Sequence, residues 1–309
     1  MASDAGAAQA RLQQALEQAV QNLAKGEWSV ELGPAGDLDQ PGAGHFHLVP
    51  ELFVQLAGHT DFQFPGHHQR LLPGQVLLLP PRLLHAERVA DDPGGAPFAN
   101  LVLQADGDRL ACHLAQQVAP GQPGIQHLVA LAHPQGRRIH GWLTDAAGLH
   151  EADRLAAAAP WRGAQARALV CAALAGTLRA LLDPPAQAMA EPPLVARLRV
   201  LVQNQLGDQG LCVRSLAGQS GCTADHLSHV FARHTGERLV AYINRLRLVR
   251  AAQLLQDTPM AAKQVAWACG FASQSYFSRA FSQHHGVTPT TWRTKRSQAL
   301  HQRGAARAR

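Results

Sequence analysis

Two different spacings of hydrophobic residues divide the chain. Residues 5 to 25 place Leu12, Leu16, Val20 and Leu23 at helical spacing, which predicts an amphipathic helix. From about residue 28 to 104, short apolar runs are separated by Pro and Gly clusters. The runs are WSVEL, HFHLV, ELFVQLA, DFQF, QVLLL and FANLVLQ. Strands of this length, with turn signals at this spacing, predict a compact β-barrel or sandwich.

Beyond residue 108 the chain is expected to be mainly helical. Residues 108 to 160 are rich in Ala and indicate helices broken at PGQPG and HPQGRR, and a further helix is predicted from Gly163 to Leu182. The segment 183–193, DPPAQAMAEPP, is rich in Pro and Ala and has few bulky residues. It is therefore predicted to be an interdomain linker, after which the hydrophobic pattern has a helical period.

A short motif occurs twice in the last third of the chain, as LSHVFARHTG at 227–236 and FSRAFSQHHG at 277–286. Each copy follows a helix and a turn that contains Gly, and each begins at a capping residue, Thr223 or Ser273. This order of elements is typical of a helix-turn-helix. The apolar residues expected to hold the helices together are Leu216, Leu227, Val230 and Phe231 in the first copy, and Val265, Tyr276, Phe277 and Phe281 in the second.

The segment between the two copies, LVAYINRLRLVRAAQLLQD, predicts one long helix. Its length is about 28 Å at about 1.5 Å per residue. Successive major-groove faces of B-DNA are about 34 Å apart, so this helix can set two recognition helices one DNA turn apart. The alternative is a plain helical bundle with a duplicated hairpin.

Charge is divided unevenly along the chain. From Pro192 to Arg309 there are 16 Lys and Arg against 4 Asp and Glu, a net charge of +12, whereas residues 1 to 191 carry a net charge of −6. A basic module of this kind indicates a nucleic-acid partner, and a merely solvated basic surface is the alternative. Five scattered Cys residues without a C-x-x-C pair argue against a disulfide framework or a cysteine zinc site. Without a visible secretory signal or a long apolar span, we expect a cytoplasmic protein with no membrane partner.

Residues 194 to 293 resemble the DNA-binding domain of AraC/XylS-type transcription regulators. The resemblance is strongest from Val265 to Arg293, in the run of GF, SYFSR, F, G, P and WR. It implies two helix-turn-helix units joined by a long helix, with double-stranded DNA as the partner. The base-reading positions it implies are Asp225, Ser228, His229, Gln274, Ser275 and Arg279. Arg279 suits guanine, Gln274 suits adenine and Asp225 suits the amino group of cytosine.

Four arginines are expected to contact DNA phosphates, which position a protein without reading sequence. They are Arg233, Arg245, Arg247 and Arg250. For each of them, a solvated or core-capping role is the alternative.

Polar residues that can bind a metal stand in two longer segments of the region from about residue 28 to 104. GHFHLVPELFVQLAG contains His45, His47 and Glu51, and PGQVLLLPPRLLHAE contains His85. Because side chains alternate along a strand, His45 and His47 are expected on one face. Three imidazoles and one carboxylate suit divalent iron, manganese, zinc or nickel. The alternative is that these groups line an effector pocket or satisfy one another inside the barrel.

The spacing of these residues resembles the two cupin motifs, H-x-H-x3-E-x6-G and G-x5-P-x4-H. Arg82 stands where the second motif usually has Gly, and Val89 stands where it often has Asn. Cupin-like barrels are the usual sensor domains of AraC/XylS-type regulators. The resemblance therefore implies a small-molecule effector, with a divalent metal as the candidate cofactor. It also implies a homodimer formed through the region of the 163–182 helix, and RNA polymerase as a further partner. The alternative for this helix is a core helix of the sensor domain.

Together these observations predict an α+β chain in four parts. Residues 1–182 form a cupin-like sensor and dimerisation region with flanking helices, 183–193 a linker, 194–296 a double helix-turn-helix domain and 297–309 a basic tail. The predicted function is sequence-specific regulation of transcription in response to a small molecule, with no catalytic residues. The alternatives are a metal-dependent cupin enzyme or metal sensor fused to a DNA-binding domain, and a helical interaction protein. The effector, the operator and the choice between activator and repressor are left open.

Overall fold

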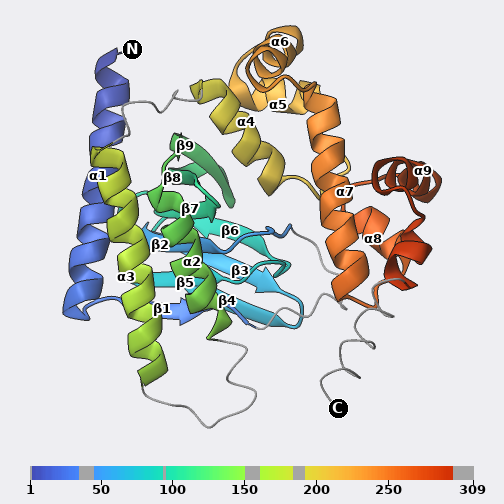
Figure 1. Cartoon of the computed structure of the whole chain (residues 1–309). Helices are drawn as coiled ribbons and strands as arrows, with labels where there is room; N and C mark the ends of the chain where they lie inside the picture. Colours follow the sequence, from blue (N-terminus) through green and yellow to red (C-terminus); the bar gives the residue numbers. More distant parts are fainter. Residues whose placement is uncertain (1, 35–44, 93–94, 150–160, 184–191, 295–309) are drawn as a thin grey trace, which may run out of the picture. The chain divides into compact units, whose positions relative to one another are not determined.

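The computed structural model describes residues 2–34, 45–92, 95–149, 161–183 and 192–294. It divides into two compact units, the first running to Arg197 and the second beginning at Leu198 (Figure 1). The first is rich in β-sheet and the second is helical, as the sequence predicts. Most of the predicted linker and the whole of the predicted basic tail lie outside the described residues.

The first unit contains two sheets and three covering helices among its described residues. The strands are β1 (Ser29–Leu32), β2 (Glu51–Ala57), β3 (His59–Phe64), β4 (His67–Leu71), β5 (Gln75–Leu79), β6 (Ala86–Ala90), β7 (Ala99–Asp106), β8 (Arg109–Ala119) and β9 (Gln122–Ala132). Six of them form a sheet in the order β1-β5-β2-β7-β8-β9, and the others form a sheet in the order β4-β3-β6. The helices are α1 (Ala2–Lys25), α2 (Gln135–Gly148) and α3 (Trp161–Leu182).

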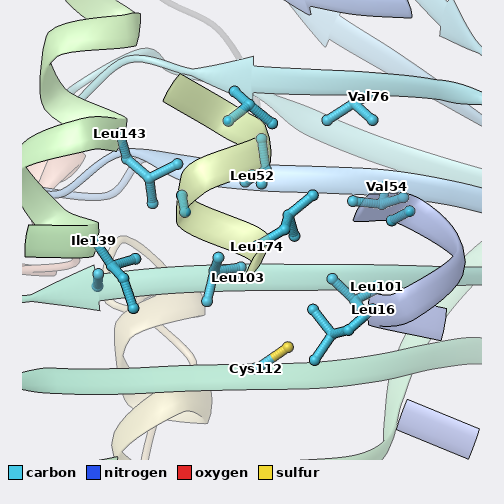
Figure 2. Packing of buried hydrophobic residues seen from close by; sticks show 14 of the residues in the cluster. Leu16, Leu52, Val54, Val76, Leu101, Leu103, Cys112, Ile139, Leu143 and Leu174 are labelled. Carbon is cyan, nitrogen blue, oxygen red and sulfur yellow. The ribbon is translucent and has the colours of Figure 1, made fainter. Parts of the chain in front are cut away.

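The alternation of side chains along each strand creates two hydrophobic layers. On β2, Leu52 and Val54 pack with residues of α1, α2 and α3, such as Leu16 and Leu174 (Figure 2). Phe53, between them in sequence, points the other way into a second cluster. That cluster joins residues of the two sheets, and burial of each large side chain stabilises the fold by about 1.5–3 kcal/mol. The face of the larger sheet that is turned away from the helices therefore packs against the smaller sheet, and the space between the two sheets forms a second interior layer.

Helix α3 matches the predicted 163–182 helix and packs along α1 and α2 (Figure 1). By length and composition alone it could cross a membrane. However, Val170, Ala173 and Leu174 are fully buried in the helix–sheet cluster. This packing accounts for the apolar character of α3 as that of a core helix.

The prediction of Ala-rich helices after residue 108 is wrong for residues 109–132. These residues form the hairpin β8–β9, and PGQPG supplies its turn, where Gly121 has a φ of +76°. Leu110, Cys112 and Leu114 occupy alternate positions and are buried in the helix–sheet cluster. This period of two, and the pairing of β8 with β7, outweigh the helix propensity of Ala.

The run HFHLV is also not a regular strand, contrary to the prediction. Among its residues, only His45 takes part in sheet-like pairing, through one isolated bridge with His85. The pairing of His45 with His85 nevertheless joins the two predicted ligand segments directly. Two strands that the pattern did not reveal, β4 and β6, flank β3 in the smaller sheet.

The second unit consists of helices in its described residues. They are α4 (Pro193–Asn204), α5 (Val213–Ser220), α6 (Ala224–Thr235), α7 (Leu239–Asp257), α8 (Ala262–Ala268) and α9 (Gln274–His285). Helix α7 is the predicted nineteen-residue connector. The α5–α6 pair lies at one end of α7 and the α8–α9 pair at the other (Figure 1).

Arg82 has an unusual backbone conformation. Among the described residues it is the one non-glycine residue with a positive φ, at +69°. The left-handed conformation costs about 1–2 kcal/mol for a residue with a β-carbon, which explains why Gly is usual here in the cupin motif. The Arg82 amide donates a hydrogen bond to the carbonyl of His47 at 2.7 Å, so the turn supports a predicted ligand.

We expect Arg82→Gly to be more stable than Arg82→Ala by about 0.5–1 kcal/mol. Both variants lack the guanidinium, but only Gly relieves the backbone strain, and its greater freedom in the unfolded chain offsets part of that gain. Urea unfolding of the two variants, followed by circular dichroism, measures the difference. Equal free energies of unfolding would show that the turn is not strained.

Candidate nucleic-acid interface and metal centre

Helices α6 and α9 are built in the same way. Thr223 and Ser273 are their N-caps, and each hydroxyl accepts a hydrogen bond from the amide three residues later, at 3.3 Å. Both helices end at a glycine in the left-handed conformation, Gly236 or Gly286. The predicted caps and helix stops are therefore confirmed.

One face of each helix is committed to the core. Leu227 and Phe231 are fully buried on α6, and Phe277 and Phe281 are fully buried at the same offsets on α9. Of the other four predicted core residues, Leu216 and Val265 are buried too, whereas Val230 is half-buried. Tyr276 is 47% exposed, which contradicts its predicted core role.

The predicted base-reading residues lie on the remaining surface of the two helices. Asp225, His229, Gln274, Ser275 and Arg279 are exposed, and Ser228 is half-buried. On α6 the offsets of three and four residues place Asp225, Ser228 and His229 on one face. Both helices can therefore present polar side chains to a groove while their apolar residues remain in the core.

The predicted phosphate contacts differ in their surroundings. Arg233 is exposed, whereas Arg245 forms an ion pair with Glu237, with 2.8 Å between Nη2 and Oε2. Arg247 and Arg250 are buried, with 8% and 1% of their surface exposed. The structure therefore contradicts a phosphate role for these two residues, because a buried guanidinium cannot reach a phosphate in this conformation.

Arg247 instead joins α7 to neighbouring helix ends. Its Nε donates to the carbonyl of Leu206 at 3.1 Å, and its Nη2 donates to the carbonyl of Asp208 at 2.6 Å. A β-carbon at Gly270 would lie 2.7 Å from the same Nη2, so the turn between α8 and α9 needs Gly at this position. Burial, together with the nearby charge of Arg247, lowers the pKa of Arg250 to about 9, which leaves it cationic at neutral pH.

The sequence-based prediction missed two exposed cations at matching positions of the repeat. Arg214 on α5 and Lys263 on α8 both lie two residues before the matched core positions Leu216 and Val265. The internal repeat thus places one exposed positive charge at the same point of each unit. Arg214 and Lys263 already align in the two copies of the repeat, so a comparison of polar as well as apolar positions would have found them.

The four predicted metal ligands of the first unit come together. His45, His47, Glu51 and His85 each offer a donor atom, and these atoms all lie within 4.8 Å of one another. Oε2 of Glu51 lies 3.1 Å from Nε2 of His47 and 3.5 Å from Nε2 of His85. Nδ1 of His85 lies 2.9 Å from the carbonyl of Leu83, which keeps Nδ1 protonated and directs Nε2 toward the cluster.

The electrostatics of the cluster suit a cation. Burial by itself would raise the pKa of Glu51, but the charge of His47 and a hydrogen bond from His85 lower it to about 2. The carboxylate is therefore ionised, and its Oε1 accepts a hydrogen bond from Nε2 of Gln104 at 2.5 Å. An oriented carboxylate among imidazoles fits a divalent cation, and Gln104 fixes the oxygen that faces away from the imidazoles.

Other polar residues of this interior were missed. They are Gln104 on β7, His113 on β8 and Glu87 on β6. Burial lowers the pKa of His113 to about 4, so this imidazole is neutral at physiological pH. Glu87 stands two residues after His85, an alternation visible in the sequence, whereas Gln104 and His113 are found only once the strand register is known.

Aromatic side chains occupy the space beside the cluster. The rings of Phe53 and Phe62 both lie 6.4 Å from the ring of His85. They belong to the buried cluster that packs between the sheets. These surroundings favour an ion over a bulky organic ligand at this position.

Comparison with known proteins gives a consistent picture for the second unit. A family model described as "Helix-turn-helix domain" matches residues 216–295. The "Probable transcription factor PqrA" of Proteus vulgaris is 34% identical over 86 residues, which cover 28% of this chain and 70% of that protein. The "HTH-type transcriptional activator RhaR" of Salmonella dublin is 29% identical over 100 residues, which cover 32% of this chain but only 35% of that protein.

A solved structure is similar to about a third of the chain. It is a "transcriptional regulator (AraC-type DNA-binding domain-containing proteins)" from Chromobacterium violaceum, 31% identical, covering 34% of this chain and 94% of that chain with a TM-score of 0.32. The residues matched by the family model lie within the helical unit.

We expect Arg247→Met to lower the free energy of unfolding of the second unit by about 2–4 kcal/mol, because the carbonyls of Leu206 and Asp208 lose their donor. Arg279→Met is the matched control, and its exposed side chain predicts a change within about 0.5 kcal/mol. Native-state hydrogen exchange of α7 and α8 amides measures both. Unchanged protection in Arg247→Met would contradict the structural role of this arginine.

Proposed function

Because the chain belongs to the helix-turn-helix transcription regulators of the AraC type, we propose that it reads DNA with α6 and α9 together. The observation that supports this most strongly is the identical construction of the two helices, fifty residues apart. Each has the same kind of cap, the same buried pair and the same terminal glycine. The connecting α7 is about 28 Å long, close to the spacing of about 34 Å between successive major-groove faces.

In this proposal the two helices differ in the chemistry they present to the bases. On α9, Arg279 donates two hydrogen bonds to guanine and Gln274 recognises adenine, with Ser275 beside them. On α6, Asp225 accepts from the amino group of cytosine, and Ser228 and His229 complete the surface. The α9 unit carries the stronger donor and sets the tighter base preference.

Phosphate contacts are assigned to exposed cations. Arg214 and Lys263 take equivalent positions in the two units, and Arg233 adds a charge near the end of α6. Arg245 is a weaker candidate because Glu237 already holds its guanidinium. These contacts supply affinity that depends on salt and fix the register of the protein on DNA.

Substitution of Arg279 and of Lys263 should have different effects on DNA binding. Arg279→Ala is expected to cost about 1–3 kcal/mol and to relax the preference at one base pair. Lys263→Ala should leave base preference unchanged and reduce the slope of log affinity against log salt by about one unit. Site selection from random DNA, followed by fluorescence anisotropy at several salt concentrations, measures both effects. Identical selected sites for Arg279→Ala and the wild type would remove Arg279 from the base-reading set.

We further propose that the first unit is a cupin-like sensor that binds a divalent metal ion. His45, His47, Glu51 and His85 would hold the ion, and Leu83 and Gln104 would orient two of these ligands. Such an ion supplies a fixed positive centre that an effector can bind. The ion or effector can regulate DNA binding only if it binds two conformational states of the chain with different affinities. A homodimer formed through the region of α3, and contact with RNA polymerase, are proposed from the family resemblance alone.

An organic effector is the second candidate ligand. A surface cavity of about 400 Å³ is lined by Asp61, Arg88, Val89, Ala90, Pro120 and Gly121. This volume is within the usual range of small-molecule sites. The metal-dependent enzyme remains an alternative hypothesis that turnover of a substrate by this chain would establish, whereas family membership favours sensing.

Metal analysis tests the sensor proposal. Untagged protein purified without chelator should contain about one equivalent of divalent metal by mass spectrometry, and a His45→Ala, His85→Ala double variant should lose it. A His67→Ala, His68→Ala double variant is the matched control, because both residues are exposed on β4, and it should keep the metal. Metal-free wild-type protein that also fails to take up added ions would leave the organic effector as the working model.

A further inference from the structure

A second carboxylate borders the proposed metal site. Oε1 of Glu87 lies 3.9 Å from Nε2 of His45 and 3.8 Å from Nε2 of His85. Oε2 of Glu51 lies 3.5 Å from the same Nε2 of His85 and 3.1 Å from Nε2 of His47. Nε2 of His85 is therefore close to both carboxylates, whereas His47 is paired with Glu51 and His45 with Glu87.

The strand register directs Glu87 inward. Glu87 is paired across β6 and β3 with Phe62, which is buried between the sheets. Because side chains alternate, the neighbouring Arg88 points to the other face, where it lines the surface cavity. The Glu87 side chain is only 12% exposed. A buried carboxylate is costly unless a cation accompanies it, so its position beside the histidines requires an explanation.

We propose that Glu87 is a fifth ligand of the metal ion and that it makes the site selective for Mn²⁺ or Fe²⁺ relative to Zn²⁺. This inference rests on the metal site proposed above and adds a residue that neither cupin motif specifies. Zn²⁺ is satisfied by four ligands in a tetrahedron, which the imidazoles and Glu51 already supply. Mn²⁺ and Fe²⁺ accept more ligands, and Mn²⁺ in particular favours carboxylate oxygens. Two carboxylates also balance the charge of a divalent ion.

The selectivity proposed here concerns the ratio of the Mn²⁺ and Zn²⁺ affinities, and not which ion binds more tightly. Zn²⁺ binds most nitrogen and oxygen sites more tightly than Mn²⁺ does, whatever the ligand set. An added carboxylate reduces the difference between the Zn²⁺ and Mn²⁺ affinities. The proposal therefore predicts how the two affinities change when Glu87 loses its charge.

Metal titrations of the full-length chain with Mn²⁺ and with Zn²⁺ test this. Glu87→Gln should weaken Mn²⁺ binding at least about tenfold and Zn²⁺ binding less than about threefold, because only the larger ligand shell includes Glu87. Glu17→Gln on the exposed side of α1 is the matched control and should change neither affinity. Glu87→Asp, which keeps the charge but withdraws the carboxylate, should also lose Mn²⁺ affinity. Circular dichroism verifies that each variant is folded.

Substitution with Co²⁺ provides an independent readout. The visible bands of Co²⁺ become more intense when its coordination number falls from five or six to four, so Glu87→Gln should have the stronger spectrum. The role of Glu87 alone would be overturned if Glu87→Gln weakened the binding of Mn²⁺ and Zn²⁺ equally. It would also be overturned if this variant kept its Mn²⁺ affinity and its Co²⁺ spectrum were unchanged. A wild-type chain that binds none of these ions would overturn the metal site itself, and the inference with it.

Discussion

Neither α6 nor α9 can be stable by itself, because an isolated helix of twelve residues is marginal in water. Each must bury one face, and each does so with a Leu–Phe or Phe–Phe pair in its middle. Their partners are the short helices α5 and α8, and the long helix α7 to which both pairs are joined. The opposite face is left for polar residues. The need to bury half of each helix therefore determines which residues remain accessible to DNA.

In the same unit, the net charge of the sequence does not reveal which basic residues are exposed and which stabilise the interior. The net charge of its sequence indicates a nucleic-acid partner, yet Arg247 and Arg250 are interior residues of the helical unit. Arg247 binds the carbonyls that follow α4, so its charge holds the domain together. The exposed charges, among them those of Arg214, Arg233, Lys263 and Arg279, are accessible to a partner. Composition thus indicates the class of partner, whereas burial separates the exposed cations from the arginines of the interior.

The parts of the fold that could be predicted from the sequence are those that depend on residues close together along the chain. The caps at Thr223 and Ser273, the terminal glycines and the buried pairs were predictable because helical spacing records them within a few residues. The four metal-ligand candidates were grouped correctly by motif spacing, although HFHLV is not a strand. Strand β8 was mistaken for a helix because Ala and Leu satisfy both patterns over a short window. Its residue His113, like Gln104, could not be assigned to the interior without the register of strands distant in sequence.

The central claim is that one chain carries two DNA-reading helices about one turn of DNA apart. A methylation-protection footprint of the wild-type chain on its selected site tests this most directly, because it reports contacts to guanine in the major groove. The account predicts two protected clusters on one face of the duplex, separated by about ten base pairs. A single protected cluster, or two clusters on opposite faces, would contradict it.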